Sequence, residues 1–481
     1  MKKMKRVILL SGAIAAVLAG AGCSRGGEGD TKLTWYMPGV KTDSSYDDVF
    51  KAVDDKLSEK YGLGLDIRLI DSKNFSQKMQ MMNASREKYD LVFTSNWSNN
   101  FYTNVDNGAL ADLTDVLKEN APNVYNSLSK SEKDAVTVNG KMYAVPNWQV
   151  QARAAGFCFP KEMVEKTGID IDSINSFEDL EPYLASITSE NPECNKIGGG
   201  WHHAMTYYGM VTVVQQGLPG AVYYNKSGKP EVINQYETEE FARFAKLMRK
   251  WVNDGYSSGV LGTKDYRKKE YKQTPVWWDG WKPGQDIEDS NNYGYDIVTK
   301  QISPAVISAE SILGTLTGIS ANSAHINEAC RMIEVFNTDK EIYNLLAWGI
   351  DGKDYEKVSD NIIKINDDST YSMSNWMIGS VENSYIIDGN SADLWEKTRS
   401  FNDAAVVSAL NGFSPDNSSF NAELGNCETV VKEYLDTIQF GLADPDETIA
   451  KFNADLKVAG VDTVLAEVQK QIDKWWETQN K

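Results

Sequence analysis

Positive charge is scarce in this sequence of 481 residues. It holds 49 Lys and Arg residues against 68 Asp and Glu residues, which leaves a formal net charge of −19. A nucleic acid or an anionic lipid surface is met by clustered Lys and Arg, and the chain offers no such patch. We therefore predict no nucleic-acid partner and no electrostatic binding to lipid.

Cysteine and histidine are also rare, and known catalytic motifs are absent. The five cysteines are widely spaced without a CxxC pair, and the three histidines are His202, His203 and His325. The adjacent pair lacks the spacing of a metal site, and no GxSxG, HExxH or Walker A pattern occurs. We predict no metal, no cofactor and no enzymatic activity. A carboxylate pair that acts on glycans stays open, since acidic residues are abundant.

A long apolar run occurs only at the N-terminus. Four basic residues precede the apolar stretch 7–21, which is typical of an export signal and short for a membrane span. The sequence Ala21-Gly22-Cys23 resembles a bacterial lipobox, although Gly20 stands where Leu is usual. We expect residues 1–22 to be a lipoprotein signal peptide, Cys23 to carry the lipid, and residues 23–31 to form a flexible tether. A plain secretory signal is the alternative.

Hydrophobic periodicity after the tether alternates between strands and helices. Helices are expected over 45–62 and 74–88, and strands over 32–39, 63–71 and 89–95. This order predicts a parallel α/β lobe, in which ligands bind beyond the carboxyl ends of the strands. Amphipathic helices are expected over 238–255 and, with a break at Gly460, over 445–479.

Several sequence blocks together resemble one family, the bacterial extracellular solute-binding proteins of family 1. "NGALADLTDVL" (107–117) is similar to its GxLxDLT segment, and "VNGKMYAVPNW" (138–148) to its NGKxYAVP signature. The segments 316–356 and 412–427 resemble, respectively, the return through the first lobe and a helical C-terminal region found in a lipoprotein subgroup. These blocks keep the family's order along nearly the whole mature chain.

The resemblance implies an α/β fold of two lobes joined by a hinge, the type II periplasmic-binding-protein-like fold. It implies a first lobe over 32–146 with 305–365 and a second over 147–304 with 366–481. It also implies a monomeric substrate-binding lipoprotein of an ABC importer, anchored by lipid on the outer face of the cytoplasmic membrane. The expected partners are an oligosaccharide, permease subunits and, through them, an ATPase.

Aromatic residues reach 11% of the chain, with 13 Trp and 23 Tyr. A sugar offers C–H faces that stack on aromatic rings, and hydroxyls that bond to polar side chains. The segment "TPVWWDGWKPG" (274–284) is the preferred platform, because in the sugar-binding members that it resembles a strand of this kind ends in a glycine and an exposed Trp at the cleft. Strand alternation allows at most one of Trp277 and Trp278 to join Trp281 there. We predict ligand contact by Trp281, Trp278, Asp279, Trp148, Gln149, Trp97, Asn96, Trp35, Tyr36 and Trp376.

Two readings remain beside oligosaccharide capture. A solute-binding protein of this kind can take a non-sugar cargo such as a peptide, and a surface lipoprotein can be an enzyme that acts on glycans. Arg153 can meet a carboxylate of the cargo or a neighbouring Asp or Glu.

Overall fold

Three parallel strands begin the described part of the chain, and a helix joins each to the next. The computed structural model describes residues 31–259, 264–413 and 415–479. β1 (Thr31–Pro38), α1 (Ser45–Tyr61), β2 (Leu63–Ile70), α2 (Ser72–Ala84) and β3 (Leu91–Thr94) follow the predicted order. The predicted lipid site at Cys23 and the signal segment 1–22 lie outside the described residues.

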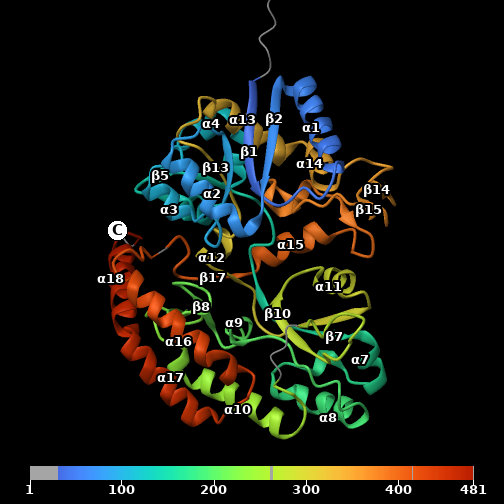
Figure 1. Cartoon of the computed structure of the whole chain (residues 1–481), viewed down its shortest axis with the longest axis vertical. Coiled ribbons are helices and arrows are strands. Elements are labelled where there is room, and N and C mark those ends of the chain that lie inside the picture. The colour runs from blue at the N-terminus through green and yellow to red at the C-terminus, as the bar shows by residue number, and fades with distance from the viewer. Residues whose placement is uncertain (1–30, 260–263, 414, 480–481) are drawn as a thin grey trace, which may run out of the picture.

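The first sheet has the strand order β2-β1-β3-β13-β6. β13 (Leu316–Ile319) pairs antiparallel with both β3 and β6 (Ala144–Pro146), so a late segment of the chain completes a sheet that the first residues begin. Figure 1 shows this lobe above a second one. The shorter elements that the chain adds to this lobe are α3 (Phe101–Asp106), α4 (Val116–Asn120), α5 (Pro122–Ser127), α6 (Lys130–Ala135), β4 (Thr137–Val138), β5 (Lys141–Met142) and α12 (Ala309–Ile312).

Local sequence explains how α1 is built and where it ends. Val49, Val53 and Leu57 recur at helical spacing and are buried against the sheet. Gly62 ends the helix at a φ of 63°, a left-handed conformation that glycine adopts without a steric penalty, and its N–H bonds to the last carbonyls. The sequence prediction of a helix over 45–62 is confirmed.

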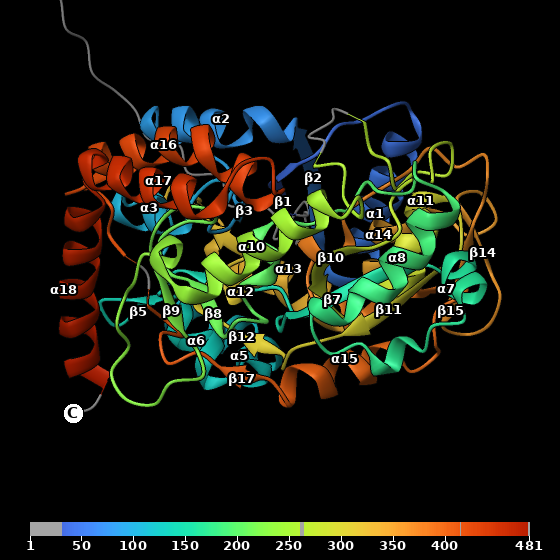
Figure 2. The same cartoon turned by 90° about the horizontal axis from the view of Figure 1, so that it is seen from below.

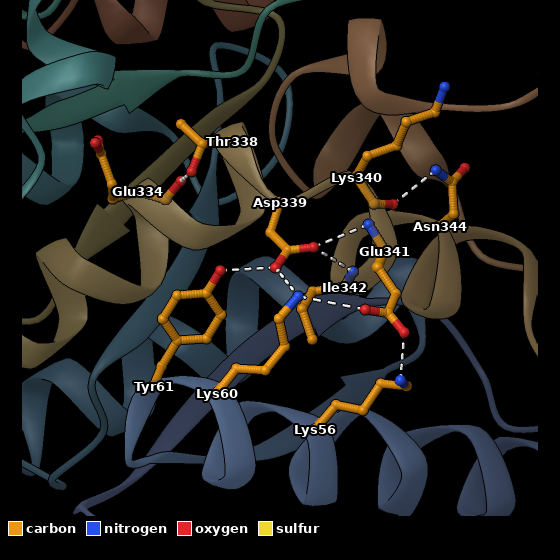
Figure 3. Close-up of polar contacts among 10 residues, drawn as sticks. All are labelled: Lys56, Lys60, Tyr61, Glu334, Thr338, Asp339, Lys340, Glu341, Ile342 and Asn344. Carbon is orange, nitrogen blue, oxygen red and sulfur yellow. Dashed lines mark hydrogen bonds and ion pairs between the residues drawn. The ribbon is translucent and has the colours of Figure 1, made fainter.

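A network of polar side chains joins α1 to α14 (Lys340–Trp348) on the outside of the first lobe. Asp339 caps α14 by accepting hydrogen bonds from the backbone N–H groups of Glu341 and Ile342. Lys60 and Tyr61, at the end of α1, donate to the same carboxylate over 2.5 and 2.6 Å (Figure 3). Burial alone raises the pKa of Asp339, but these bonds outweigh it and hold that pKa below its ordinary value.

The second lobe contains a three-stranded antiparallel sheet of order β10-β7-β11. The strands are β7 (Ala154–Pro160), β10 (Trp277–Trp281) and β11 (Ile297–Gln301). Both faces are covered, because Trp278 packs in a large core on one face while Trp277 packs with Cys158 and Ile297 on the other. The helices and short strands around this sheet are α7 (Lys161–Thr167), α8 (Glu181–Glu190), α9 (Trp201–Ala204), β8 (Met210–Thr212), β9 (Ala221–Tyr223), α10 (Glu239–Asn253) and α11 (Gln285–Tyr293).

Three C-terminal helices form a bundle along one edge of the second lobe. α16 (Asn421–Gln439) and α17 (Pro445–Ala459) contact α10, and α18 (Val461–Gln479) packs on both (Figures 1 and 2). The predicted break at Gly460 is confirmed, since its φ of 101° separates α17 from α18. Side chains from this bundle complete the core of the second lobe.

The chain crosses between the lobes three times, and the crossings lie side by side. Arg153 bridges to Val306 in β12 (Val306–Ile307), and β12 pairs with β17 (Val406–Val407). The side-chain amide N–H of Asn147 donates to Thr315 Oγ1 and to the Met377 carbonyl, each over 3.0 Å. Asn402 accepts from the N–H groups of Gln151 and Ala152 over 3.0 Å. These bonds tie separate segments into one hinge.

The third crossing lies later in the chain than the sequence suggested. We expected the second lobe to resume near residue 366, but Tyr371, Met377 and Ile378 are buried in the first lobe's core. The reason is that α14 holds this segment against the first lobe. Asn344 of α14 donates to the Asn383 carbonyl and accepts from the Tyr385 N–H. The strands and the α-helix between 355 and 403 are β14 (Tyr355–Lys357), β15 (Ile362–Ile365), β16 (Ile386–Ile387) and α15 (Leu394–Asp403).

Two further findings concern the described residues only. Cys158, Cys194, Cys330 and Cys427 are buried free thiols, so none of these four forms a disulfide. Within the same residues, no helix combines the length and the apolar composition needed to span a membrane.

Candidate functional site

A cavity of about 930 Å³ lies between the lobes, where the strand ends of the first lobe face the sheet of the second. Residues from both lobes and from the hinge line it, including Gln149 and Gln151 of the first crossing and Val306 of the second. A cavity of this size accommodates a ligand of several rings rather than a single small ion or amino acid.

Five aromatic side chains of the first lobe line the cavity, and we call them the aromatic wall. They are Trp97, Trp348, Trp376, Tyr385 and Trp395. Trp97 follows β3 and has 58% of its surface exposed, although a tryptophan on a protein surface usually packs against its neighbours. Its ring lies 6.3 Å from the Trp376 ring, with an angle of 50° between them. Buried Phe93 lies behind both rings, at 5.7 and 6.1 Å.

The loop after β3 explains why Trp97 stands out from the sheet. Ser95 Oγ accepts hydrogen bonds from the N–H groups of Trp97 and Ser98, which tightens the turn. Asn99 adopts a φ of 48°, and its side chain bonds to the Phe93 carbonyl. The Trp97 indole N–H donates to the Gly314 carbonyl over 2.8 Å, which fixes the ring orientation.

The indole N–H groups of two further members of the aromatic wall are also bonded within the protein. Trp348 donates to Ser384 Oγ over 2.9 Å, and Trp395 donates to the Ser384 carbonyl over 2.8 Å. Because these donors are already engaged, these rings offer a ligand their apolar faces. The wall is therefore suited to stacking on flat C–H surfaces.

The second lobe lines the cavity with polar groups, and we call Arg153, His202, His203, Asp279, Lys282 and Glu288 the polar wall. His203 Nδ1 lies 3.0 Å from Asp279 Oδ1, and Lys282 forms an ion pair with Glu288 over 2.5 Å. Among the described residues, no carboxylate lies within ion-pair distance of Arg153. The guanidinium is thus available to a ligand.

Enclosure changes the titration of two members of the polar wall. Burial and, to a smaller extent, the neighbouring His203 lower the pKa of His202 to about 4, so His202 is neutral near pH 7. Arg153 is exposed to the cavity, but the protein of both lobes that surrounds it displaces solvent and lowers its pKa, while Glu288 and Asp279 oppose the shift. Arg153 remains a cation at neutral pH, because its ordinary pKa is far higher.

Half of the residues predicted from the sequence do line the cavity. They are Asn96, Trp97, Gln149, Asp279 and Trp376. Asn96 and Trp97 come from the loop after β3, Gln149 from the first crossing and Asp279 from β10. The cavity thus collects residues from both lobes and the hinge, as the two-lobed fold implied. Their contact with a ligand stays a prediction.

The three tryptophans of the segment 274–284 lie elsewhere. Trp278 is 2% exposed and packs against Phe177 and Phe244 in the second lobe's core. Trp277 is 1% exposed on the opposite face. Trp281 packs over Gly156 and donates to Thr299 Oγ1 over 3.0 Å, so its ring does not line the cavity. The sequence could not show that both faces of this strand are covered.

The remaining predicted aromatics also lie away from the cavity. Trp35 is 2% exposed and packs against Phe336 in the first lobe's core. Tyr36 lies beside Tyr89, which precedes β3, and Trp148 lies near the Arg399 guanidinium at 5.5 Å. Trp35 and Tyr36 belong to the body of β1, which extends to Pro38, rather than to its end.

Sequence reasoning missed several lining residues. Trp395 was not among the predicted residues; it lies in helix α15, one side of which faces the cavity. His203 was weighed only as a metal ligand, and no metal-binding cluster occurs among the described residues. Trp348 and Tyr385 were not predicted either, because nothing in the sequence around them indicates that they line the cavity.

Comparison with known proteins identifies relatives of the whole chain. A family described as "Domain of unknown function (DUF3502)" matches residues 409–477. A carbohydrate ABC transporter substrate-binding protein of Streptococcus pneumoniae serotype 4 (strain ATCC BAA-334 / TIGR4) is 26% identical over 99% of each chain.

Solved structures of a solute-binding protein also match nearly the whole chain. The N-glycan transport solute binding protein NgtS of Streptococcus pneumoniae is 26% identical, with a TM-score of 0.83 over 93% of this chain and all of that one. Its complex with Man1GlcNAc matches at 25% identity with a TM-score of 0.73, over 93% and 100% of the two chains. The complex with Man5GlcNAc matches at 26% with a TM-score of 0.70, over 93% and 99%.

Proposed function

Since the chain belongs to the extracellular solute-binding proteins of family 1, we propose that it captures an oligosaccharide between its lobes and delivers it to an ABC importer. The observation that carries this proposal is the pairing of an aromatic wall with a polar wall across one cavity. Aromatic faces stack on the C–H surfaces of pyranose rings, while amides, carboxylates and the guanidinium bond to the hydroxyls.

The size of the cavity and its relatives support a ligand of several sugar units. The five aromatic side chains offer more surface than one ring can cover. The relative of known structure is named for N-glycan transport and has been solved with Man1GlcNAc and Man5GlcNAc. These two glycans are therefore the first probes to use.

Closure of the lobes around the glycan completes the proposal. Three adjacent crossings make a hinge, so the walls can approach one another without unfolding either core. The TM-score is higher for the NgtS structure that is not described as a complex (0.83) than for the two NgtS–glycan complexes (0.73 and 0.70). The sequence identity is nearly the same for all three. The described conformation thus resembles the first of these more than the complexes.

The remaining parts of the proposal concern the surroundings of the protein. Lipid attached to Cys23 anchors the chain on the outer face of the cytoplasmic membrane, where a monomer presents the closed lobes to permease subunits and, through them, to an ATPase. The family supports this arrangement, and mass spectrometry of the mature N-terminus from the native bacterium tests the lipid.

Calorimetric titration of the chain from residue 24 onward tests the function. We expect micromolar or tighter binding of Man1GlcNAc or Man5GlcNAc, and a smaller radius of gyration in X-ray scattering when the glycan is added. Maltopentaose and an unrelated pentapeptide serve as comparison ligands. Binding of the peptide and of no oligosaccharide would overturn the sugar proposal, and shortened glycan products after incubation would overturn the assignment as a binding protein.

A further inference from the structure

The four-residue helix α9 carries two members of the polar wall, His202 and His203. A helix of one turn is not stable by itself, because its first hydrogen bond costs the ordering of several residues. Its N-cap residue, Gly200, provides no side chain to bond the free N–H groups. The position of α9, and with it the His203–Asp279 pair, must therefore be fixed by other segments.

One of these segments is the strand β10 of the same lobe. Gly198 bridges to Trp277, and the Trp278 indole N–H donates to the Gly200 carbonyl over 3.0 Å. A Cβ on Gly199 would lie 2.6 Å from the Trp278 carbonyl oxygen, so only glycine fits there. The two buried tryptophans thus hold the backbone that leads into α9, while Asp279 follows them on the strand.

The other segment comes from the C-terminal bundle. Gln439, the last residue of α16, accepts a hydrogen bond from the Trp201 N–H through Oε1 over 2.9 Å. Its amide N–H donates to Asp436 Oδ1 over 2.7 Å, which orients the side chain. Gln439 is 8% exposed, and a Cβ on Gly200 would lie 2.7 Å from its Oε1. A residue far away in sequence thus supplies the cap that α9 lacks.

We propose that the C-terminal bundle, the part of the chain matched by the domain of unknown function, positions the polar wall: Gln439 fixes α9 and thereby sets the His203–Asp279 pair against the ligand. This inference rests on the proposed function, because the pair is assigned to an oligosaccharide. It gives the bundle a role in ligand recognition besides its contribution to the core. Gln439 itself does not line the cavity and acts through α9.

The substitution Gln439→Leu removes the hydrogen-bond acceptor and puts an apolar side chain of similar size in its place. We expect Man5GlcNAc to bind about tenfold more weakly, because the displaced His203–Asp279 pair loses one or two hydrogen bonds to the glycan. The double variant Gln439→Glu with Asp436→Asn restores an acceptor at 439 and a donor at 436. It should bind within about twofold of the unaltered chain.

Gln469→Leu is a matched control from the same bundle. Gln469 of α18 accepts from the Val232 N–H over 2.8 Å, in a loop that does not line the cavity. This variant should lose thermal stability like Gln439→Leu and keep its affinity for the glycan. Equal losses of affinity in the two variants would show that the bundle acts through stability alone and would overturn the proposal.

A second readout needs no ligand. The chain has three histidines, so their imidazole NMR signals are few, and His325 in the first lobe is an internal reference. We expect the chemical shifts of the His203 signals to change in Gln439→Leu and not in Gln469→Leu. If Gln439→Leu does not fold, Gly200→Ala decides instead, because its Cβ displaces the same contact; unchanged His203 signals there would refute the positioning role.

The two proposals fail in different ways. If the unaltered chain binds no oligosaccharide, the proposed function is wrong, whatever the histidine signals show. If it binds Man5GlcNAc and Gln439→Leu binds equally well with unchanged histidine signals, only the role of the bundle is wrong.

Discussion

Replacing Trp97 by alanine should weaken glycan binding strongly and stability little. A pyranose that stacks on this ring covers about 100 Å² of apolar surface, which contributes about 2.5 kcal/mol at most. That figure corresponds to about a 60-fold change in Kd, and we expect a loss of about 10- to 60-fold. The side chain is already 58% exposed, so the folded state loses mainly the bond to Gly314 and contacts with Phe93.

Trp281→Ala should have the opposite effect: a large loss of stability and little change in glycan affinity. This ring packs over Gly156 and against Phe401, and its N–H bonds to Thr299. Removing a largely packed tryptophan costs about 2–4 kcal/mol of stability. Since the ring does not line the cavity, the affinity for the glycan should change by less than about threefold.

Calorimetric titration with Man5GlcNAc and denaturant unfolding of both variants check this pair of expectations. The measurements should be made at a temperature where each variant is fully folded. A tenfold loss of affinity in Trp281→Ala, together with unchanged affinity in Trp97→Ala, would refute the reasoning and return the sugar platform to β10.

Three further predictions concern the hinge, acid stability and the first lobe. Asn147→Leu should lower the free energy of unfolding by about 3 kcal/mol in urea titrations, because it leaves the buried polar partners Thr315 and Met377 without its amide. Burial disfavours the charged form of His202 in the folded state, so stability should fall as pH drops from 6.5 to 4, and His202→Gln should reduce that slope in melting curves. Asp339→Ala should cost about 1 kcal/mol at neutral pH, less as pH falls below the ordinary carboxyl pKa of 3.8, and leave glycan affinity unchanged by calorimetry.

The fold could be predicted well because local signals and family-like blocks agreed. The helix that begins at Ser45 shows apolar residues at helical spacing and a glycine at its end, and both recur in the structure. The break at Gly460 carried the same kind of signal. The third crossing carried none, because the contacts that hold Tyr385 and Asn383 to α14 depend on residues far away in sequence.

The site was predicted less completely, since lining a cavity is a property of the assembled surface. Trp97 could be found because a tryptophan among asparagines has little reason to pack. The sequence could not show that Trp278, unlike Trp97, is buried, since its burial depends on Phe177 and Phe244, which other segments supply. Trp395 shows the converse, in that a helical pattern does not reveal which side meets the ligand.

The strand order of the first lobe has a consequence for how the chain folds. β13 lies between β3 and β6, so the central sheet cannot close until a segment near residue 319 has joined strands made much earlier. Pairing of such distant segments slows folding, because a long loop must be ordered before the contacts form. A nascent chain that has not reached β13 therefore exposes an unfinished sheet edge, where pairing with another chain competes with folding.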